Sequence, residues 1–241
     1  MNKIFYFFIS ILVFDMLIVS CTKDNVCYSC DVELDNWTKE NLKEIRAMST
    51  EEWFELDYKY SRPAYVAQRS NSKFRIWEVK LNDVLRYDWN NKEEAHIKAL
   101  LKFATMNKRI FRDDLYKNSQ LFSKTKSFLD NWVRYAIDSL RWNKELVYAI
   151  SADPHLIADT KGGMMIKDNG IELLIRPKGV LLECNCNLSS MWYLDCENVP
   201  CEETLRGCGT LLLFRCNGRH NLGIPPDPTE ERPGGRFEDS H

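Results

Sequence analysis

Apolar side chains recur at intervals of three and four residues through residues 74–150, a spacing typical of amphipathic helices. The clearest stripe consists of Phe128, Leu129, Trp132, Val133, Ala136, Ile137 and Leu140. Three further stripes are Phe74, Trp77, Leu81, Val84 and Leu85, then Ile97, Leu100, Leu101 and Ala104, and finally Leu146, Val147 and Ile150. The last helix should end before Asp153-Pro154, because a residue that precedes proline avoids the α conformation.

Polar residues in front of these stripes predict where the helices begin. Ser49 with Glu52 three residues later forms the pattern of a capping box. Ser70 and Ser72 are candidate caps for the next stripe, and Asn90-Asn91 precedes the one after it. The tryptophans within these stripes are interpreted as core residues and not as a ligand-stacking set.

The pattern changes after Pro154. Asn169-Gly170 is a turn signal between Ile166 and residues 171–175, which together predict a β-hairpin. The runs Val180-Leu181-Leu182 and Leu211-Leu212-Leu213-Phe214 predict further strands. The expected fold is therefore mainly α, an irregular helical bundle, followed by a small disulfide-rich β/loop module.

The N-terminus has the features of an export signal. A short basic start precedes an apolar run from Ile4 to Phe14 that is too short to span a bilayer comfortably. Ser20 then directly precedes Cys21, as in the lipobox of bacterial lipoproteins, so Cys21 is the predicted lipidation site. Several acyl chains would hold the protein on a membrane without a transmembrane helix. The alternative is an ordinary secretory signal in which this cysteine is coincidental.

These features divide the chain into five expected parts. A signal peptide covers residues 1–20, a lipid anchor and tether 21–35, a helical domain 36–155, a C-terminal module 160–220, and a disordered tail 221–241 that is rich in proline and glycine. The expected location is the cell envelope, lipid-anchored, on the outer membrane, periplasmic or surface face. The helical domain and the C-terminal module are expected to be separable.

Composition narrows the classes of partner. The formal net charge of −2 gives no electrostatic reason to expect nucleic acid as a partner. An apolar content of 44% is enough for a packed core. The expected partners are the membrane, through the N-terminal lipid anchor, and an unknown protein or envelope target.

Cysteines are concentrated near the C-terminus. Six of the nine lie between Cys184 and Cys216, and none lies between Cys30 and Cys184. If Cys21 carries lipid, eight remain in an oxidising compartment, which favours four disulfides. The predicted disulfide residues are Cys27, Cys30, Cys184, Cys186, Cys196, Cys201, Cys208 and Cys216. Their connectivity stays open, including a local Cys27–Cys30 bridge. Zinc is the alternative, but a zinc site needs a close pair of ligands at each end, so no metal is expected.

The glycines around Cys208 predict a tight turn. Gly207 and Gly209 flank this cysteine, and glycine readily adopts the positive φ that such turns require. Cys184 and Cys186, two residues apart, would share one face of a strand and reach different partners.

A family resemblance rests on this segment. The order Cys184-Asn185-Cys186, Cys196, Cys201, Gly207-Cys208-Gly209 and Cys216-Asn217-Gly218 resembles the bacteriocin fulvocin C and the lipoproteins related to it. Residues 72–81 resemble the helical region that precedes the module in those relatives. The sequence departs from the pattern at Phe214, where a second Cys-x-Cys would need a cysteine. The resemblance implies an antagonistic, antimicrobial role for the module.

A second hypothesis is a non-toxic protein-interaction module at the cell surface or in the periplasm. Residues 184–220 contain three arginines and four carboxylates and so have a net charge of −1. A membrane-lytic peptide is usually cationic. Gly162-Gly163 is a candidate processing site for release of the module, but it is more simply a turn. Proteolytic release distinguishes the two hypotheses.

Nothing in the sequence predicts an enzyme or a cofactor. The histidines His96, His155, His220 and His241 form no zinc-protease motif, and no phosphate-binding or nucleophile-elbow motif is present. Asp113-Asp114 is interpreted as a solvated turn. Cys27 and Cys30 have the spacing of a redox pair but lack the βαβ context of such motifs, so no catalytic residue is assigned.

Overall fold

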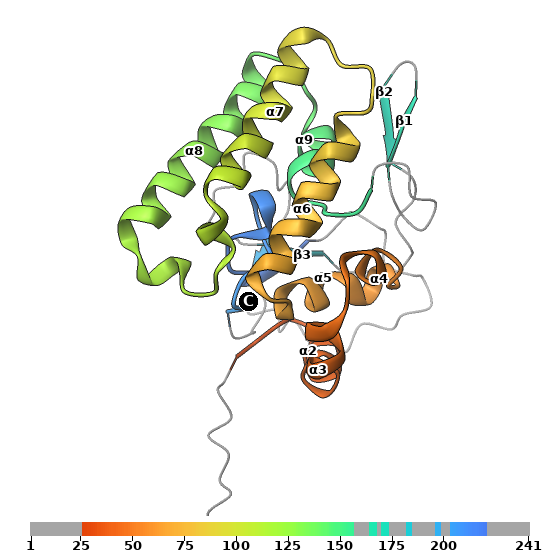
Figure 1. Cartoon of the computed structure of the whole chain (residues 1–241), viewed down its shortest axis with the longest axis vertical. Coiled ribbons are helices and arrows are strands. Elements are labelled where there is room, and N and C mark those ends of the chain that lie inside the picture. The colour runs from red at the N-terminus through yellow and green to blue at the C-terminus, as the bar shows by residue number, and fades with distance from the viewer. Residues whose placement is uncertain are drawn as a thin grey trace, which may run out of the picture.

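The computed structural model describes residues 26–156 and 203–220, together with the backbone of four short strands between them. These parts of the chain are mainly helical, as the sequence predicts (Figure 1). The predicted signal peptide, Cys21 and the predicted tail lie outside the described residues. Among the helices described, none is both long and apolar enough to cross a membrane.

Four short helices form one end of the described chain: α2 (Val32–Glu40), α3 (Leu42–Ala47), α4 (Thr50–Phe54) and α5 (Tyr58–Ala67). The capping box at Ser49 and Glu52 is confirmed, with both reciprocal hydrogen bonds present at the start of α4. Asp31 accepts the N–H groups of Glu33 and Leu34 and so caps α2. The helical part begins at Val32, four residues before the predicted boundary.

Longer helices form the other end: α6 (Ser70–Val84), α7 (Asn91–Met106), α8 (Ser119–Asp138) and α9 (Lys144–Ser151). Helices α7 and α8 lie side by side, with α6 next to α7 (Figure 1). Helix α9 ends before Asp153-Pro154, as predicted. Asn90, which precedes the predicted stripe, caps α7 in a second capping box with Glu93. The predicted caps of α6 are wrong, because Arg69 is the N-cap residue and Ser70 and Ser72 lie inside the helix.

Two short 3₁₀ helices join α7 to α8. They are η1 (Lys108–Phe111) and η2 (Leu115–Lys117), and the turn between them places Arg112, Asp113 and Asp114 at the edge of the bundle. Ile110, Phe111 and Leu115 on the inner side of this turn are buried, so the turn is fixed to the core by apolar contacts.

The strands form two small antiparallel sheets. The predicted hairpin is present as β1 (Met164–Lys167) and β2 (Gly170–Leu173), with Lys167 opposite Gly170. The second sheet has the order β3-β5-β4 and consists of β3 (Leu182–Cys184), β4 (Cys196–Asn198) and β5 (Gly218–His220).

The run Leu211–Phe214 is not the predicted strand. Residues Thr210–Leu212 form the 3₁₀ helix η3, and Leu211 and Leu212 have φ angles of 56° and 50°. A disulfide between Cys208 and Cys216 closes this segment, hereafter the Cys208–Cys216 loop. A strand would direct alternate side chains to opposite faces. The compact loop instead buries the side chains of Leu211, Leu212, Leu213 and Phe214, all at most 4% exposed.

Glycine allows the backbone conformation of the tight turn at the start of this loop. Gly209 has φ 71°, and a Cβ atom built there would lie 2.4 Å from Cδ2 of Phe214. A side chain at this position would therefore strain the backbone and displace the Phe214 ring. The predicted positive φ at Gly207 and Gly209 is confirmed.

The Cys208–Cys216 loop lies in the core of the helical bundle. Its four apolar side chains belong to the same buried cluster as Trp53, Trp77 and Leu100 of the helices. The segment 203–220 runs between α6 and α8 in Figure 1, and the Phe214 ring meets Phe122 of α8 edge to face at 6.1 Å. Leu211–Phe214, which the prediction assigns to the C-terminal module, thus pack in the same core as the helices.

Candidate functional site

The structure shows the bonding of only some of the cysteines that were predicted to form disulfides. Cys208 and Cys216 bond to each other, and Cys30 is also disulfide-bonded and is buried beside them. The sulfur of Cys27 donates to the carbonyl oxygen of Ser29 at 3.0 Å and is not bonded to Cys30, so the local Cys27–Cys30 bridge, one of the open alternatives, does not form. The physical reason is that the Cys30 sulfur already forms another disulfide, and the residue is buried in one cluster with Cys208 and Cys216.

The side chains of the other predicted cysteines lie outside what the structure describes. Cys184 and Cys196 are seen only as backbone, in β3 and β4. Cys21, Cys186 and Cys201 are outside the described residues altogether.

Polar contacts fix the Cys208–Cys216 loop to the helices. Arg62 donates to the carbonyl oxygen of Gly207 at 2.8 Å, and the Tyr65 hydroxyl donates to that of Leu211 at 3.1 Å. The N–H of Arg215 donates to the Tyr116 hydroxyl at 2.9 Å. Each bond pairs a backbone N–H or C=O group of the loop. Without such a partner, burying that group would cost free energy.

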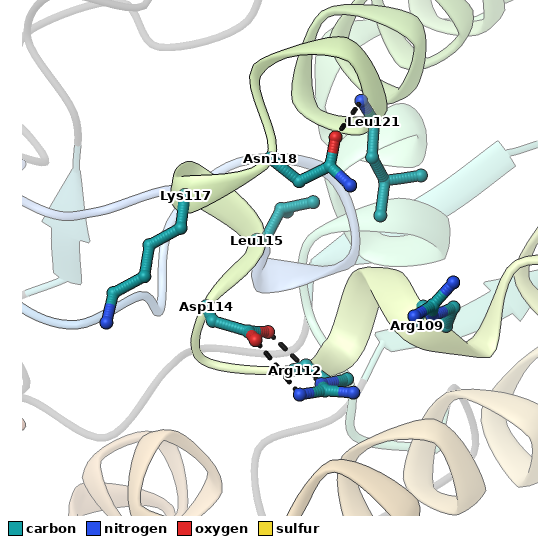
Figure 2. A pocket seen from close by; sticks show the side chains of 7 residues that line it. All are labelled: Arg109, Arg112, Asp114, Leu115, Lys117, Asn118 and Leu121. Atoms are coloured by element: carbon teal, nitrogen blue, oxygen red, sulfur yellow. Dashed lines mark hydrogen bonds and ion pairs between the residues drawn. The ribbon is translucent and has the colours of Figure 1, made fainter.

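A pocket of about 160 Å³ opens on the turn before α8. It is lined by Arg109, Arg112, Asp114, Leu115, Lys117, Asn118 and Leu121 (Figure 2). Figure 2 shows Asn118 and Leu121 on one side, the Arg112–Asp114 pair on another, and the Lys117 ammonium directed away from them. Leu115 is 1% exposed and belongs to the core, so the pocket has a fixed apolar base.

Hydrogen bonds hold two parts of the pocket wall. The guanidinium of Arg112 donates twice to the carboxylate of Asp114, at 3.1 and 2.9 Å, which is the strong bidentate geometry. The Asn118 side chain accepts from the N–H of Leu121 at 2.9 Å and caps α8. Arg112 and Asn118 are therefore oriented before any ligand arrives.

Buried charges lie directly behind this turn. Lys73 Nζ is 2.7 Å from Asp113 Oδ1, and Arg206 Nε is 3.3 Å from the same oxygen. Arg206 also donates to the carbonyl oxygen of Arg112. The side chains of Lys73 and Arg206 are 0% and 1% exposed, whereas that of Asp113 is 51% exposed. Two buried cations thus share one carboxylate.

This arrangement leaves an excess of buried positive charge. Burial lowers the pKa of Lys73 to about 7, and Arg206 acts in the same direction while Asp113 opposes it. The Nη1 group of Arg206 has no hydrogen-bond partner in the described part of the chain. Buried donors without partners are rare in native proteins and each needs an explanation.

We predict that Lys73→Met raises the free energy of unfolding by about 1 kcal/mol at pH 6, because the buried charge disappears while Asp113 keeps Arg206. Between its folded pKa of about 7 and the unfolded value of 10.5, the unfolded chain binds more protons at Lys73 than the folded chain does. Wild-type stability should therefore rise with pH in this window.

Urea unfolding from pH 6 to pH 9 measures both effects, and the rise should be smaller in the variant. Lys124→Met is the control, because Lys124 is an exposed lysine of α8. A loss of about 3 kcal/mol in Lys73→Met would show instead that the pair with Asp113 stabilises the fold.

A second buried cluster surrounds His155. Its Nδ1 atom is 2.6 Å from Asp153 Oδ1, and its ring stacks on Tyr58 at 4.6 Å and on Trp53 at 5.3 Å. Lys80, which is 1% exposed, donates to the carbonyl oxygen of His155. Burial alone would raise the pKa of Asp153, but His155 and Lys80 hold it well below its ordinary range.

The His155 cluster is not arranged as a catalytic centre among the described residues. The Nε2 atom of His155 is buried without a hydrogen-bond partner, so no hydroxyl or thiol in these residues is placed for activation by it. The Tyr58 hydroxyl donates to Asp153 at 3.3 Å. His155 and Asp153 instead fix the chain that follows α9 against α5 and α6.

His96 has a structural position. Its ring stacks on Trp132 at 4.4 Å, its Nε2 is 3.0 Å from the carbonyl oxygen of Trp132, and Trp132 donates back to the carbonyl oxygen of His96. Burial lowers the pKa of His96 to about 4, so the ring is neutral at pH 7. This pair joins α7 to α8 and supports the interpretation of the tryptophans as core residues.

The sequence carried a signal for two buried cations. Lys73 and Lys80 lie on the same helical face as Trp77 and Val84, at spacings of four, three and four residues. A lysine within an apolar stripe indicates a buried charge. Asp113 and Asp114 lie in an exposed turn, as interpreted, but nothing in the sequence indicated that Asp113 also pairs with the buried cations Lys73 and Arg206.

No family model matches the chain, and no curated protein or solved structure is significantly similar to it. The resemblance to the fulvocin C-related lipoproteins stays a hypothesis drawn from the cysteine and glycine spacing and from residues 72–81.

Proposed function

We propose that the chain is a lipid-anchored bacterial envelope lipoprotein that works as a binding protein and not as an enzyme. In this proposal Cys21 carries the lipid, and the disulfide-rich C-terminal region is a permanent part of the helical body that helps to present a rigid surface to an envelope partner. The supporting observation is the burial of Leu211, Leu212, Leu213 and Phe214 in the helical core.

The energetics of this burial argue against a released bacteriocin-like module. Burying one leucine or phenylalanine side chain contributes about 1.5–3 kcal/mol, so four contribute about 6–12 kcal/mol. The whole stability of a domain is about 5–15 kcal/mol. Release of the Cys208–Cys216 loop would expose these four side chains and leave a cavity among the helices. This cost of release supports the proposal that the Cys208–Cys216 loop stays part of the folded helical body.

Fractionation of cells that produce wild-type protein and Cys21→Ser tests this proposal. Antibodies against a body peptide and against the C-terminal region should detect one band in the membrane fraction for the wild type. For Cys21→Ser both signals should move together to the soluble fraction, since the thiol that accepts the lipid is absent.

Cys27→Ser is the matched control and should stay in the membrane fraction. Membrane partitioning of Cys21→Ser equal to the wild type would contradict the anchor. A C-terminal fragment that appears alone in the soluble fraction or the medium would contradict the binding-protein proposal and favour the released antagonist.

A further inference from the structure

The pocket on the turn before α8 has an excess of positive charge that the fold does not neutralise. Its lining contains three cations, Arg109, Arg112 and Lys117, and one carboxylate, Asp114, which gives a formal charge of +2 from three minus one. Arg112 is engaged by Asp114, whereas Arg109 and Lys117 make no ion pair with the described residues. The protein as a whole has a net charge of −2, so this charge is local.

Backbone donors add to the positive side of the pocket. The first N–H groups of a helix have no acceptor within it, and here the side chain of Asn118 caps only that of Leu121. Helix α8 is 20 residues long, and the positive end of its dipole adjoins the pocket. Oxyanions bind at such ends when cationic side chains are also present.

The buried charges behind the turn act in the same direction. Arg206 lies 3.3 Å and Lys73 2.7 Å from Asp113, so the single carboxylate faces a permanent positive charge from Arg206 and a partial one from Lys73, whose pKa of about 7 leaves it charged in part at pH 7. Arg206 also holds the backbone of the turn through the carbonyl oxygen of Arg112. The same two side chains therefore raise the positive potential at the turn and fix its conformation.

We propose that this pocket binds a phosphate group, either as inorganic phosphate or as the monoester end of a larger envelope molecule. A phosphate monoester carries about −1.5 to −2 charges at pH 7, which matches the pocket charge of +2, whereas a carboxylate carries only −1. Arg109 supplies the guanidinium that no carboxylate of the described chain engages, and planar guanidinium groups suit phosphate oxygens. The Lys117 ammonium reaches the ligand by rotation of its exposed stem.

This inference rests on the proposed function in one respect only, that the chain is a binding protein. Calorimetric titration of the purified, detergent-solubilised lipoprotein with inorganic phosphate tests it. The wild type should bind one phosphate, and Arg109→Gln should raise the Kd about tenfold, the loss expected for one charge-assisted hydrogen bond. Lys117→Gln should raise it less, because its ammonium is not held at the pocket.

Arg134→Gln is the matched control, because it removes one exposed arginine of α8 outside the pocket lining and should leave the Kd unchanged. Glycerol 3-phosphate distinguishes the two sources: binding as tight as that of inorganic phosphate supports a monoester ligand, and weaker binding supports free phosphate. Acetate should bind more weakly than either.

Three results would overturn the inference: no phosphate binding by the wild type, equal Kd values for Arg109→Gln and Arg134→Gln, or acetate binding as tight as phosphate. None of them bears on the membrane anchor or on release of the module, which the fractionation experiment tests separately.

Discussion

Phe214→Ala is expected to lower the free energy of unfolding of the whole protein by about 3–5 kcal/mol, the loss usual for a buried phenylalanine. Phe214 is 4% exposed and belongs to the buried cluster that contains the helical core. The helical signal in far-UV circular dichroism should therefore be lost at a lower urea concentration, in the same transition as the fluorescence of the tryptophans. A loop that only covered the surface would leave the helical transition unchanged.

Met106→Ala is the control for this experiment. Met106 is 72% exposed, so its truncation should change stability by no more than about 0.5 kcal/mol. If Phe214→Ala also stays within 0.5 kcal/mol, or if only a separate non-helical transition shifts, the C-terminal region is not part of the helical core. A second variant, Leu212→Ala, should cost about 2–5 kcal/mol by the same mechanism, since Leu212 is 0% exposed.

The helices could be predicted from the sequence because their signals are local. Periodicity of apolar residues placed α6 to α9, and the pairs Ser49 with Glu52 and Asn90 with Glu93 form capping boxes at the first residues of α4 and α7. Each of these features lies within one or two turns of helix. The Arg69 cap of α6 carries no such signal, because its side chain makes no cap hydrogen bond.

The run Leu211–Phe214 shows why the C-terminal region could not be predicted in the same way. Four consecutive apolar residues fit a buried strand, a buried helix segment or a buried loop equally well. The Cys208–Cys216 disulfide and the left-handed conformations of Leu211 and Leu212 decide among them, and neither follows from composition.

The charged sites could not be predicted from local sequence patterns either, because their members are far apart in the sequence. Arg206 and Arg112 are 94 positions apart, and their contact depends on the way the loop enters the bundle. Lys73 and Lys80 could be recognised as buried from their helical face, but their partners Asp113 and Asp153 could not be assigned without the fold. The positive charge of the pocket likewise depends on Arg109, Arg112 and Lys117, which the turn between η1 and η2 brings to one place.

Asp153→Asn is expected to lower the free energy of unfolding by about 3–5 kcal/mol at pH 7, because it removes one member of a buried charge pair. Asp153 is 8% exposed, accepts from His155 Nδ1 at 2.6 Å and compensates the charge of Lys80. Burial lowers the pKa of Lys80 to about 8, and the carboxylates of Asp153 and Asp83 oppose this shift, so the loss of Asp153 removes the larger of the two negative charges that stabilise the buried ammonium.

The pH dependence gives this prediction a definite sign. The folded-state pKa of Asp153 lies well below the ordinary value of 3.8, so near and below pH 4 the unfolded chain takes up a proton here that the folded chain does not. The stability that Asp153 contributes is fully present above pH 3.8 and is lost as the pH falls further. The difference between wild type and Asp153→Asn should therefore shrink on acidification, which urea titrations at pH 7, 5 and 3 would measure.

Two further variants separate the charge effect from a general disturbance. Asp88→Asn, at an exposed aspartate, should change stability by no more than about 0.5 kcal/mol. The double variant Asp153→Asn with Lys80→Met should recover part of the loss, because no uncompensated cation remains. A double variant less stable than Asp153→Asn alone would show that Lys80 stabilises the fold through its hydrogen bond to the carbonyl oxygen of His155 and not through its charge pair with Asp153.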